Sequence, residues 1–338
     1  MHRILLKSVT NEKEFKLFVE EVGIKSKYFI IKANGIVPSL SPAQYHEPKT
    51  LELLLSSLEG EKVIVDSYML PSGLPKGIRS ENVKEYWAEI KERYEQILEK
   101  TGLMALFRKY DVEYINVTEE VWSGRTVEAK IIREIVERKY SPVKNEEFYS
   151  HIPKRLFDLR GSVMISFARI RGANFTHPTL SMKNLFYLTP SPFRFQMYGP
   201  REAWESSVVD SAKLAYSTID VTKIYGSLFN LVGINEGIYH LCKVYTDGSG
   251  MIEASWGRYD VIDNWGKAIF GDNLVTLDAF TSQLFGVDPE RITYLKLARE
   301  ELNPWDEKLI EEAKRIRQRA IIEAEALLST TSIQNWLF

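Results

Sequence analysis

Short apolar runs alternate with helical periodicity in the first part of the chain, and this alternation most narrows the possible folds. The runs at residues 28–32 and 62–66 are compact and rich in β-forming side chains, and another short apolar run lies at 3–7. Between them, residues 11–22 and 49–58 carry apolar side chains at helical spacing. This order of strands and helices predicts a parallel sheet with right-handed crossovers.

The rest of the chain continues this pattern. Further strands are expected at 113–117, 162–170, 237–246 and 267–271, and further helices at 81–100, 127–138, 204–231, 274–285, 289–302 and 306–328. We therefore predict an α/β fold: an open, mostly parallel sheet with helices on both faces and a long C-terminal helix.

The length of 338 residues fits two lobes or one large α/β domain. A polar, irregular stretch at 145–160 favours a division into a first α/β lobe at 1–150 and a second at 151–303, followed by a helix and tail at 304–338. The second lobe contains an aromatic loop at 173–200, rich in Pro, Phe and Tyr. Long loops inside compact domains are usually functional or disordered, and its aromatic content argues for function.

The net charge of −2 gives no overall attraction to nucleic acid or to an anionic membrane. No apolar run approaches the roughly 20 residues of a membrane-spanning helix, and the N-terminus lacks the pattern of a signal peptide. The sequence therefore predicts a cytoplasmic protein without nucleic-acid or membrane partners.

Cofactor motifs are few. Cys242 is the single cysteine, which cannot hold an iron–sulfur cluster. Neither a dinucleotide-binding glycine motif nor a P-loop is present, so NAD and ATP lack their usual phosphate cradle. A divalent metal is compatible with the sequence, with Asp272 and Asp278 as its candidate ligands beside Asp66.

Three segments suggest a family. Residues 31–34 read Ile-Lys-Ala-Asn and are followed by a helix and a second strand, residues 179–186 contain Lys183-Asn184 after a strand, and residues 272–289 open with Asp and end in Gly-Val-Asp-Pro. In this order they resemble the "domain of unknown function 362" family over about residues 28 to 300. The resemblance implies an α/β fold and a set of positions, but no reaction.

The chain departs from that family at two points. Relatives often carry an iron–sulfur segment of clustered cysteines, which this chain lacks. Relatives also place a histidine shortly after the basic residue that ends the middle strand, whereas here Arg171 is followed by Gly172 and Ala173, and His177 lies further along. Whether His177 takes the place of the family's histidine is therefore an open question.

Polar residues follow several predicted strands, where ligands of open parallel sheets bind. Basic and amide side chains can hold phosphate or carboxylate oxygens and orient a ligand. The candidate ligand-binding residues are Lys32, Asn34, Asp66, Arg169, Arg171, Lys183 and Asn184.

His177 and His46 are the candidate catalytic residues, because histidine exchanges protons near neutral pH. A structural role for each is the open alternative. The predicted function is that of an enzyme acting on a small anionic metabolite, phosphorylated or carboxylic. The alternative is a non-catalytic ligand-binding or assembly protein derived from iron–sulfur relatives.

The C-terminal helix carries apolar residues on one face from Leu309 to Leu327. This face either packs on the body of the protein or forms the seam of a homodimer.

Overall fold

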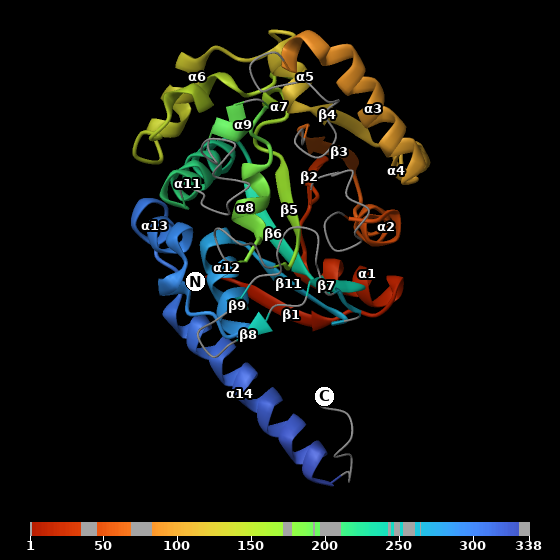
Figure 1. Ribbon diagram of the computed structural model, residues 1–338, viewed down its shortest axis with the longest axis vertical. Coiled ribbons are helices and arrows are strands. Elements are labelled where there is room, and N and C mark those ends of the chain that lie inside the picture. The colour runs from red at the N-terminus through yellow and green to blue at the C-terminus, as the bar shows by residue number, and fades with distance from the viewer. Residues whose placement is uncertain are drawn as a thin grey trace.

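The computed structural model describes residues 2–34, 46–68, 83–171, 178–191, 193–196, 211–242, 245–246, 251–252, 261–263 and 265–330. Its centre is a seven-stranded sheet with the order β1-β11-β6-β5-β2-β3-β4 (Figure 1). The strands are β1 (Ile4–Ser8), β2 (Tyr28–Lys32), β3 (Glu61–Asp66), β4 (Glu113–Asn116), β5 (Val163–Arg169), β6 (Asn230–Glu236) and β11 (Lys267–Gly271).

Five adjacent strands, β6, β5, β2, β3 and the edge strand β4, are parallel, while β11 is antiparallel to its neighbours β6 and β1. The predicted α/β fold with an open, mostly parallel sheet is thereby confirmed. Two short antiparallel pairs lie outside the sheet: β7 (His240–Cys242) with β10 (Val261–Asp263), and β8 (Tyr245–Thr246) with β9 (Met251–Ile252).

The helices connect these strands. They are α1 (Glu12–Val22), α2 (Pro48–Ser57), α3 (Trp87–Lys100), α4 (Leu103–Lys109), α5 (Val117–Trp122), α6 (Ala129–Glu137), α7 (Lys154–Phe157), α8 (Ser181–Phe186), α9 (Phe193–Gln196), α11 (Ser211–Leu228), α12 (Leu274–Leu284), α13 (Thr293–Glu301) and α14 (Glu307–Thr330). Single 3₁₀ turns are η1 (Val83–Tyr86), η2 (Glu146–Ser150) and η3 (Pro289–Arg291).

Local sequence sets the ends of these helices. The side chain of Asn11 accepts a hydrogen bond from the Glu14 N–H and so begins α1, and Gly23, with a φ of 70°, ends it. Asn273 begins α12 in the same way, by accepting from the Thr276 N–H.

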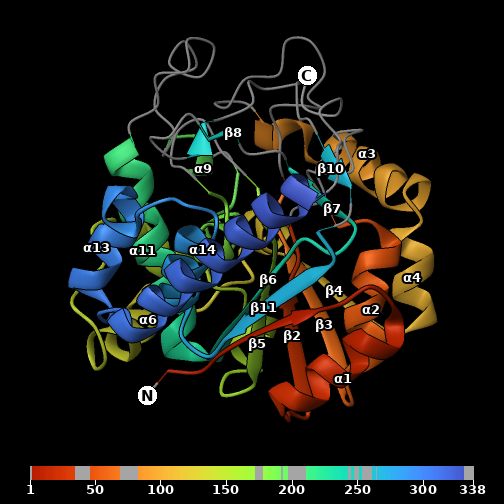
Figure 2. The same cartoon turned by 90° about the horizontal axis from the view of Figure 1, so that it is seen from below.

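The sheet is buried on both faces. Ile30 packs into a core with α6, α8, α11, α12 and α13, whereas its neighbour Ile31 packs into a second core with α1 to α4. Figure 2 shows these two helical layers on opposite sides of the strands. Burial on both faces explains why the central strands read as continuous apolar runs.

The boundary predicted near residue 150 does not separate two sheets. Strand β5, from the second predicted lobe, pairs with β2 from the first, with Lys32 opposite Ser166. Strand β1 likewise pairs with β11, from the other end of the chain. Residues 1–150 and 151–303 therefore contribute to one continuous sheet.

The structure corrects the elements expected between residues 204 and 246. Helix α11 ends at Leu228, and the strand that follows is β6 at Asn230–Glu236 rather than a strand at 237–246. Gly233 in the middle of this segment lowers its strand propensity. Tertiary packing explains the glycine, because an added Cβ would lie 2.5 Å from Leu277 and 2.6 Å from the Ser181 hydroxyl.

Helix α14 is the predicted C-terminal helix. Ile310 and Ala313 in its first half are buried in the core that α12 and α13 share, and its far end projects from the body in Figure 1. In the described part of the chain, no helix is both long enough and apolar enough to cross a membrane.

We expect Gly233→Ala to lower the free energy of unfolding by about 1–3 kcal/mol, because the added methyl group would overpack β6 against α8 and α12. Urea unfolding measures this change. The control is Gly226→Ala in α11, where the nearest atom is the movable hydroxyl of Tyr140 at 3.3 Å. Equal stability of the two variants would contradict this account of β6.

Candidate functional site

The sheet has a topological switch point between β2 and β5. The chain leaves β2 toward β3 and β4 on one side, and returns as β5 on the other side of β2, followed by β6 (Figure 1). After these two neighbouring parallel strands, the next strands of the sheet therefore lie on opposite sides, which defines the switch point. Open α/β sheets bind ligands at this position.

The structure brings the predicted ligand-binding residues to this edge. Lys32 and Asp66 end β2 and β3, Asn34 follows β2, and Arg169 and Arg171 lie at the end of β5. Lys183 and Asn184 lie on α8, which packs against β5. Each of these side chains belongs to a residue with at most 9% of its surface exposed.

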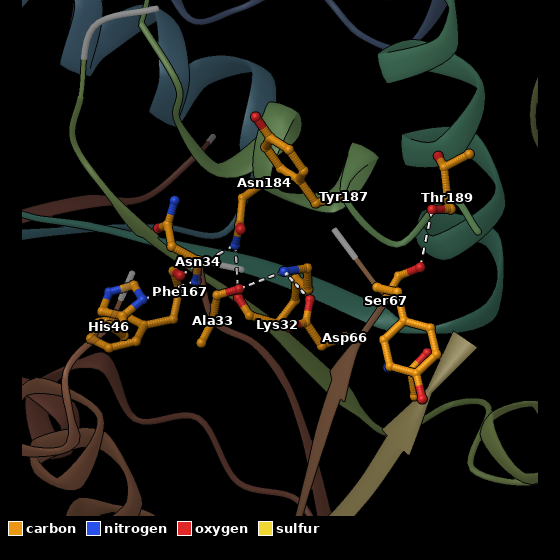
Figure 3. Close-up of polar contacts among 12 residues, drawn as sticks. Lys32, Ala33, Asn34, His46, Asp66, Ser67, Phe167, Asn184, Tyr187 and Thr189 are labelled. Atoms are coloured by element: carbon orange, nitrogen blue, oxygen red, sulfur yellow. Dashed lines mark hydrogen bonds and ion pairs between the residues drawn. The ribbon is translucent and has the colours of Figure 1, made fainter. Parts of the chain in front are cut away.

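Lys32 and Asp66 form an ion pair between adjacent strands. The Lys32 Nζ lies 3.1 Å from Asp66 Oδ1 and donates to the Ala33 carbonyl at 2.6 Å (Figure 3). Burial lowers the pKa of Lys32; Asp66 opposes this shift, and the nearby charge of Arg194 adds to it. The ammonium group is thus held among other charges in a desolvated site.

Asn34 and Asn184 join β2 to β5 where their ladder ends. Asn34 Oδ1 accepts a hydrogen bond from the Arg169 N–H. Asn184 Nδ2 donates to the Lys32 carbonyl at 2.7 Å and lies 3.2 Å from the Phe167 carbonyl (Figure 3). Backbone groups that would be left open at the switch point are satisfied by these amides.

Arg169 is paired with Glu236 from β6. The Arg169 Nε donates to Glu236 Oε1 at 2.9 Å, and the Ile238 N–H donates to Glu236 Oε2 at 2.8 Å. Burial by itself would raise the pKa of Glu236, but Arg169 and His46 outweigh it and lower the pKa to about 2. Glu236 is therefore a fixed anion that holds Arg169 in place.

His46 uses both ring nitrogens within the protein. Its Nδ1 accepts from the Asn34 N–H at 2.9 Å, and its Nε2 lies 3.0 Å from Glu236 Oε1. The ring stacks on Phe167 with centroids 4.3 Å apart. Burial lowers the pKa of His46 to about 4, despite the nearby carboxylate. His46 is therefore an enclosed imidazole that lies between the Asn34 backbone after β2 and Glu236 at the end of β6.

Two arginines flank Tyr187, which directly follows α8. The guanidinium groups of Arg171 and Arg194 lie 5.8 and 5.7 Å from the Tyr187 ring centre. Arg171 Nη2 lies 3.4 Å from the Tyr187 hydroxyl, and Arg194 Nη1 donates to the Tyr187 carbonyl at 2.8 Å. Arg194 also donates to the Tyr68 carbonyl after β3.

The segment from α8 to α9 is anchored across the ends of β3 and β4. The Ser67 hydroxyl lies 2.6 Å from the Thr118 hydroxyl and donates to the Thr189 carbonyl at 3.1 Å (Figure 3). Ser191 donates to the Tyr68 carbonyl at 2.9 Å. These bonds bring part of the predicted aromatic loop, including Arg194, to the strand ends.

Sequence reasoning missed Glu236, Arg194 and Tyr187. Glu236 was missed because β6 was misplaced, although Asn235 and Glu236 directly follow the run at residues 231–234, Leu-Val-Gly-Ile. Arg194 and Tyr187 lie inside the aromatic loop, whose function was predicted without specific residues. An arginine within a segment otherwise rich in Pro and Phe was the available signal.

Asp272 and Asp278 have different environments. Since β11 runs antiparallel to β6, Asp272 lies away from the carboxyl edge, and its Oδ1 accepts from the Arg3 N–H at 2.9 Å. The buried carboxylate of Asp278 accepts from the N–H groups of Ser181 and Met182 at 3.0 and 2.9 Å. Asp278 thus fixes the start of α8.

The structure does not bring the proposed metal ligands together, and the expectation that Asp272 lies at the carboxyl edge is wrong. Within the described ranges, no three His, Cys, Asp or Glu side chains are grouped as metal ligands would be. His177 lies outside the described residues.

Comparison with known proteins yields no relative: no family model, no curated protein and no solved structure matches the chain.

We expect the imidazole of His46 to titrate with a pKa of about 4, far below the ordinary 6.5, because burial disfavours its charged form. Its contribution to stability is then lost as pH falls from about 6.5 to 4, since the unfolded chain binds a proton that the folded one rejects. Histidine NMR, with His46→Gln for assignment, measures the titration. A pKa near 6.5 would mean that the ring is accessible and free for catalysis.

Asp278 should change the pH dependence of stability in the opposite direction to His46. Burial raises its pKa to about 7, although Met182, Asn235 and Ser181 donate hydrogen bonds that lower it. The folded state therefore binds more protons between pH 4 and 7, and stability falls as pH rises through this window. We expect the stability of the native protein relative to Asp278→Asn to decline from pH 4 to 7 and then level off, as measured by urea unfolding. A constant difference would contradict a raised pKa.

Proposed function

We propose that this protein binds a small anionic metabolite, phosphorylated or carboxylic, outside the carboxyl ends of β2 and β5. One observation carries the proposal: five basic side chains from three parts of the chain are buried at this edge. They are Lys32, Arg169, Arg171, Lys183 and Arg194, of which Lys32 lies against Asp66 and Arg169 against Glu236.

The electrostatics favour an anion. Like charges gathered in a desolvated site repel one another, and a bound anion relieves this repulsion. Arginine and lysine side chains suit phosphate and carboxylate oxygens, the former by their planar, multiple donors. The location supports the same conclusion, because the cations surround the switch point of the sheet.

Catalysis on this ligand remains a proposal. His46, with both nitrogens engaged, favours a binding and positioning role over proton transfer. His177 is then the histidine to test in an enzyme, whereas a non-catalytic binding protein requires only the cations. Membership of the "domain of unknown function 362" family, a cytoplasmic location and a homodimer through α14 are likewise proposals, supported by the motifs, the composition and the apolar face described above.

The anion site is tested by thermal unfolding with inorganic phosphate, sulfate and small carboxylates. A ligand that binds only the folded state stabilises it by about 2.7 kcal/mol at a hundredfold excess over Kd. We expect anions to raise the melting temperature, and Lys183→Met and Arg171→Met each to reduce that rise. Lys16→Met, on the exposed face of α1, is the matched control and should respond as the native protein does.

Two results would overturn the proposal. The first is the absence of any shift across the anion series at low ionic strength. The second is a shift that the control variant loses as strongly as the two site variants, because this would indicate general ionic stabilisation. If Lys183→Met does not fold, Arg171→Met decides, since Arg171 retains some exposed surface.

A further inference from the structure

The side-chain amides of Asn34 and Asn184 each form hydrogen bonds to the protein through only one of their two polar atoms. Asn34 Oδ1 is occupied by the Arg169 N–H, and Asn184 Nδ2 by the Lys32 carbonyl and its neighbours. The opposite amide atoms, Asn34 Nδ2 and Asn184 Oδ1, have no hydrogen-bond partner among the described residues. Both residues are at least 99% buried.

The two amides are neighbours. Asn184 contacts the Phe167 carbonyl and Asn34 contacts the Arg169 N–H, and these two groups lie on the same side of β5 because the residues are two apart. Figure 3 shows Asn34 and Asn184 next to each other beside Lys32. A donor from one side chain and an acceptor from the other are therefore available at the switch point.

Buried polar atoms are almost always hydrogen-bonded, since an unsatisfied one is costly. An anionic oxygen can accept from Asn34 Nδ2, but it would be repelled by the carbonyl oxygen of Asn184. That oxygen requires a donor. An ammonium group would supply one, but the surrounding cations oppose it. A neutral hydroxyl group satisfies both atoms, because it accepts and donates at once.

We infer that the ligand carries a hydroxyl group next to its anionic group, as in a hydroxy acid or the phosphate ester of a polyol or sugar. In this arrangement the hydroxyl accepts from Asn34 Nδ2 and donates to Asn184 Oδ1, while the buried cations hold the anionic oxygens. The inference rests on the proposed anion site and adds its specificity.

A small cavity beside Asn34 could hold a water molecule that binds its free amide nitrogen, but such a water would not reach Asn184. The cavity of about 10 Å³ is lined by Asn34, His46 and Asp66, with apolar walls that include Leu51 and Phe107. This size matches about one water molecule. Asn34 can therefore bind a water molecule there. Asn184 does not line the cavity, so its carbonyl oxygen still requires a hydrogen-bond donor on the α8 side.

Calorimetry with matched ligands tests the inference on the full chain. The pairs are glycerol 3-phosphate against n-propyl phosphate, and lactate against propionate, with inorganic phosphate as the reference anion. We expect the hydroxylated member of each pair to bind at least about tenfold more tightly, because the analogue without it leaves buried polar atoms unpaired.

Variants of Asn34 assign the preference to this pair of amides. Asn34→Ser should bring the ratio within each ligand pair close to one. Asn34→Asp should weaken binding of every anion, because it adds a negative charge. Asn303→Ser, at an exposed position after α13, is the control and should keep the native ratio.

The outcomes separate the two proposals. Equal affinities within both pairs, or an unchanged preference in Asn34→Ser, would overturn the hydroxyl inference and leave the anion site standing. Failure of all five ligands to bind would overturn the anion site itself. If Asn34→Ser does not fold, the ligand pairs on the native protein decide alone.

Discussion

The separation of β2 from β5 at the end of their ladder is the constraint on which the site depends. Backbone groups at this point lose their strand partners, and a buried backbone group without a partner is unfavourable. The chain solves this with side-chain amides: Asn34 accepts from the Arg169 N–H, and Asn184 donates to the Lys32 carbonyl. The amides that complete the hydrogen bonding at this end of the sheet are thus also two of the candidate ligand-binding residues.

A second consequence is that charged groups at this edge are held by fixed partners. Glu236 positions Arg169 and lies against His46, which in turn accepts from the Asn34 N–H. Asp278 binds the first N–H groups of α8 and so places Asn184 over the strands. Charges arranged by a rigid frame need little reorganisation when a ligand binds, which favours affinity. The same frame holds His46 between the Asn34 backbone and Glu236.

The sequence predicted the parallel core, because strands buried on both faces read as apolar runs and their polar ends are visible in the chain. It therefore identified Lys32, Asp66 and Arg169 at one edge. Strand direction was not visible, and the reversal of β11 moved Asp272 away from that edge. Strand β6 was missed because it contains Gly233, and glycine lowers strand propensity. This glycine is required by the close approach of Leu277, a contact between segments distant in the sequence. Glu236 and Phe167, which lie against His46, are also distant from it in the sequence, so its enclosure was not predictable.

A comparison between asparagines shows why the half-used amides point to a ligand. Asn235 is also fully buried, yet its Oδ1 accepts from the Ser181 hydroxyl at 2.8 Å and its Nδ2 donates to Asp278 at 3.1 Å and Thr281 at 3.0 Å. The protein thus satisfies both ends of a structural amide one residue before Glu236. At the switch point, by contrast, Asn34 and Asn184 each leave one amide atom without a hydrogen-bond partner among the described residues. Departures from internal consistency are expected where a sequence serves function as well as folding, and here both departures lie at the switch point.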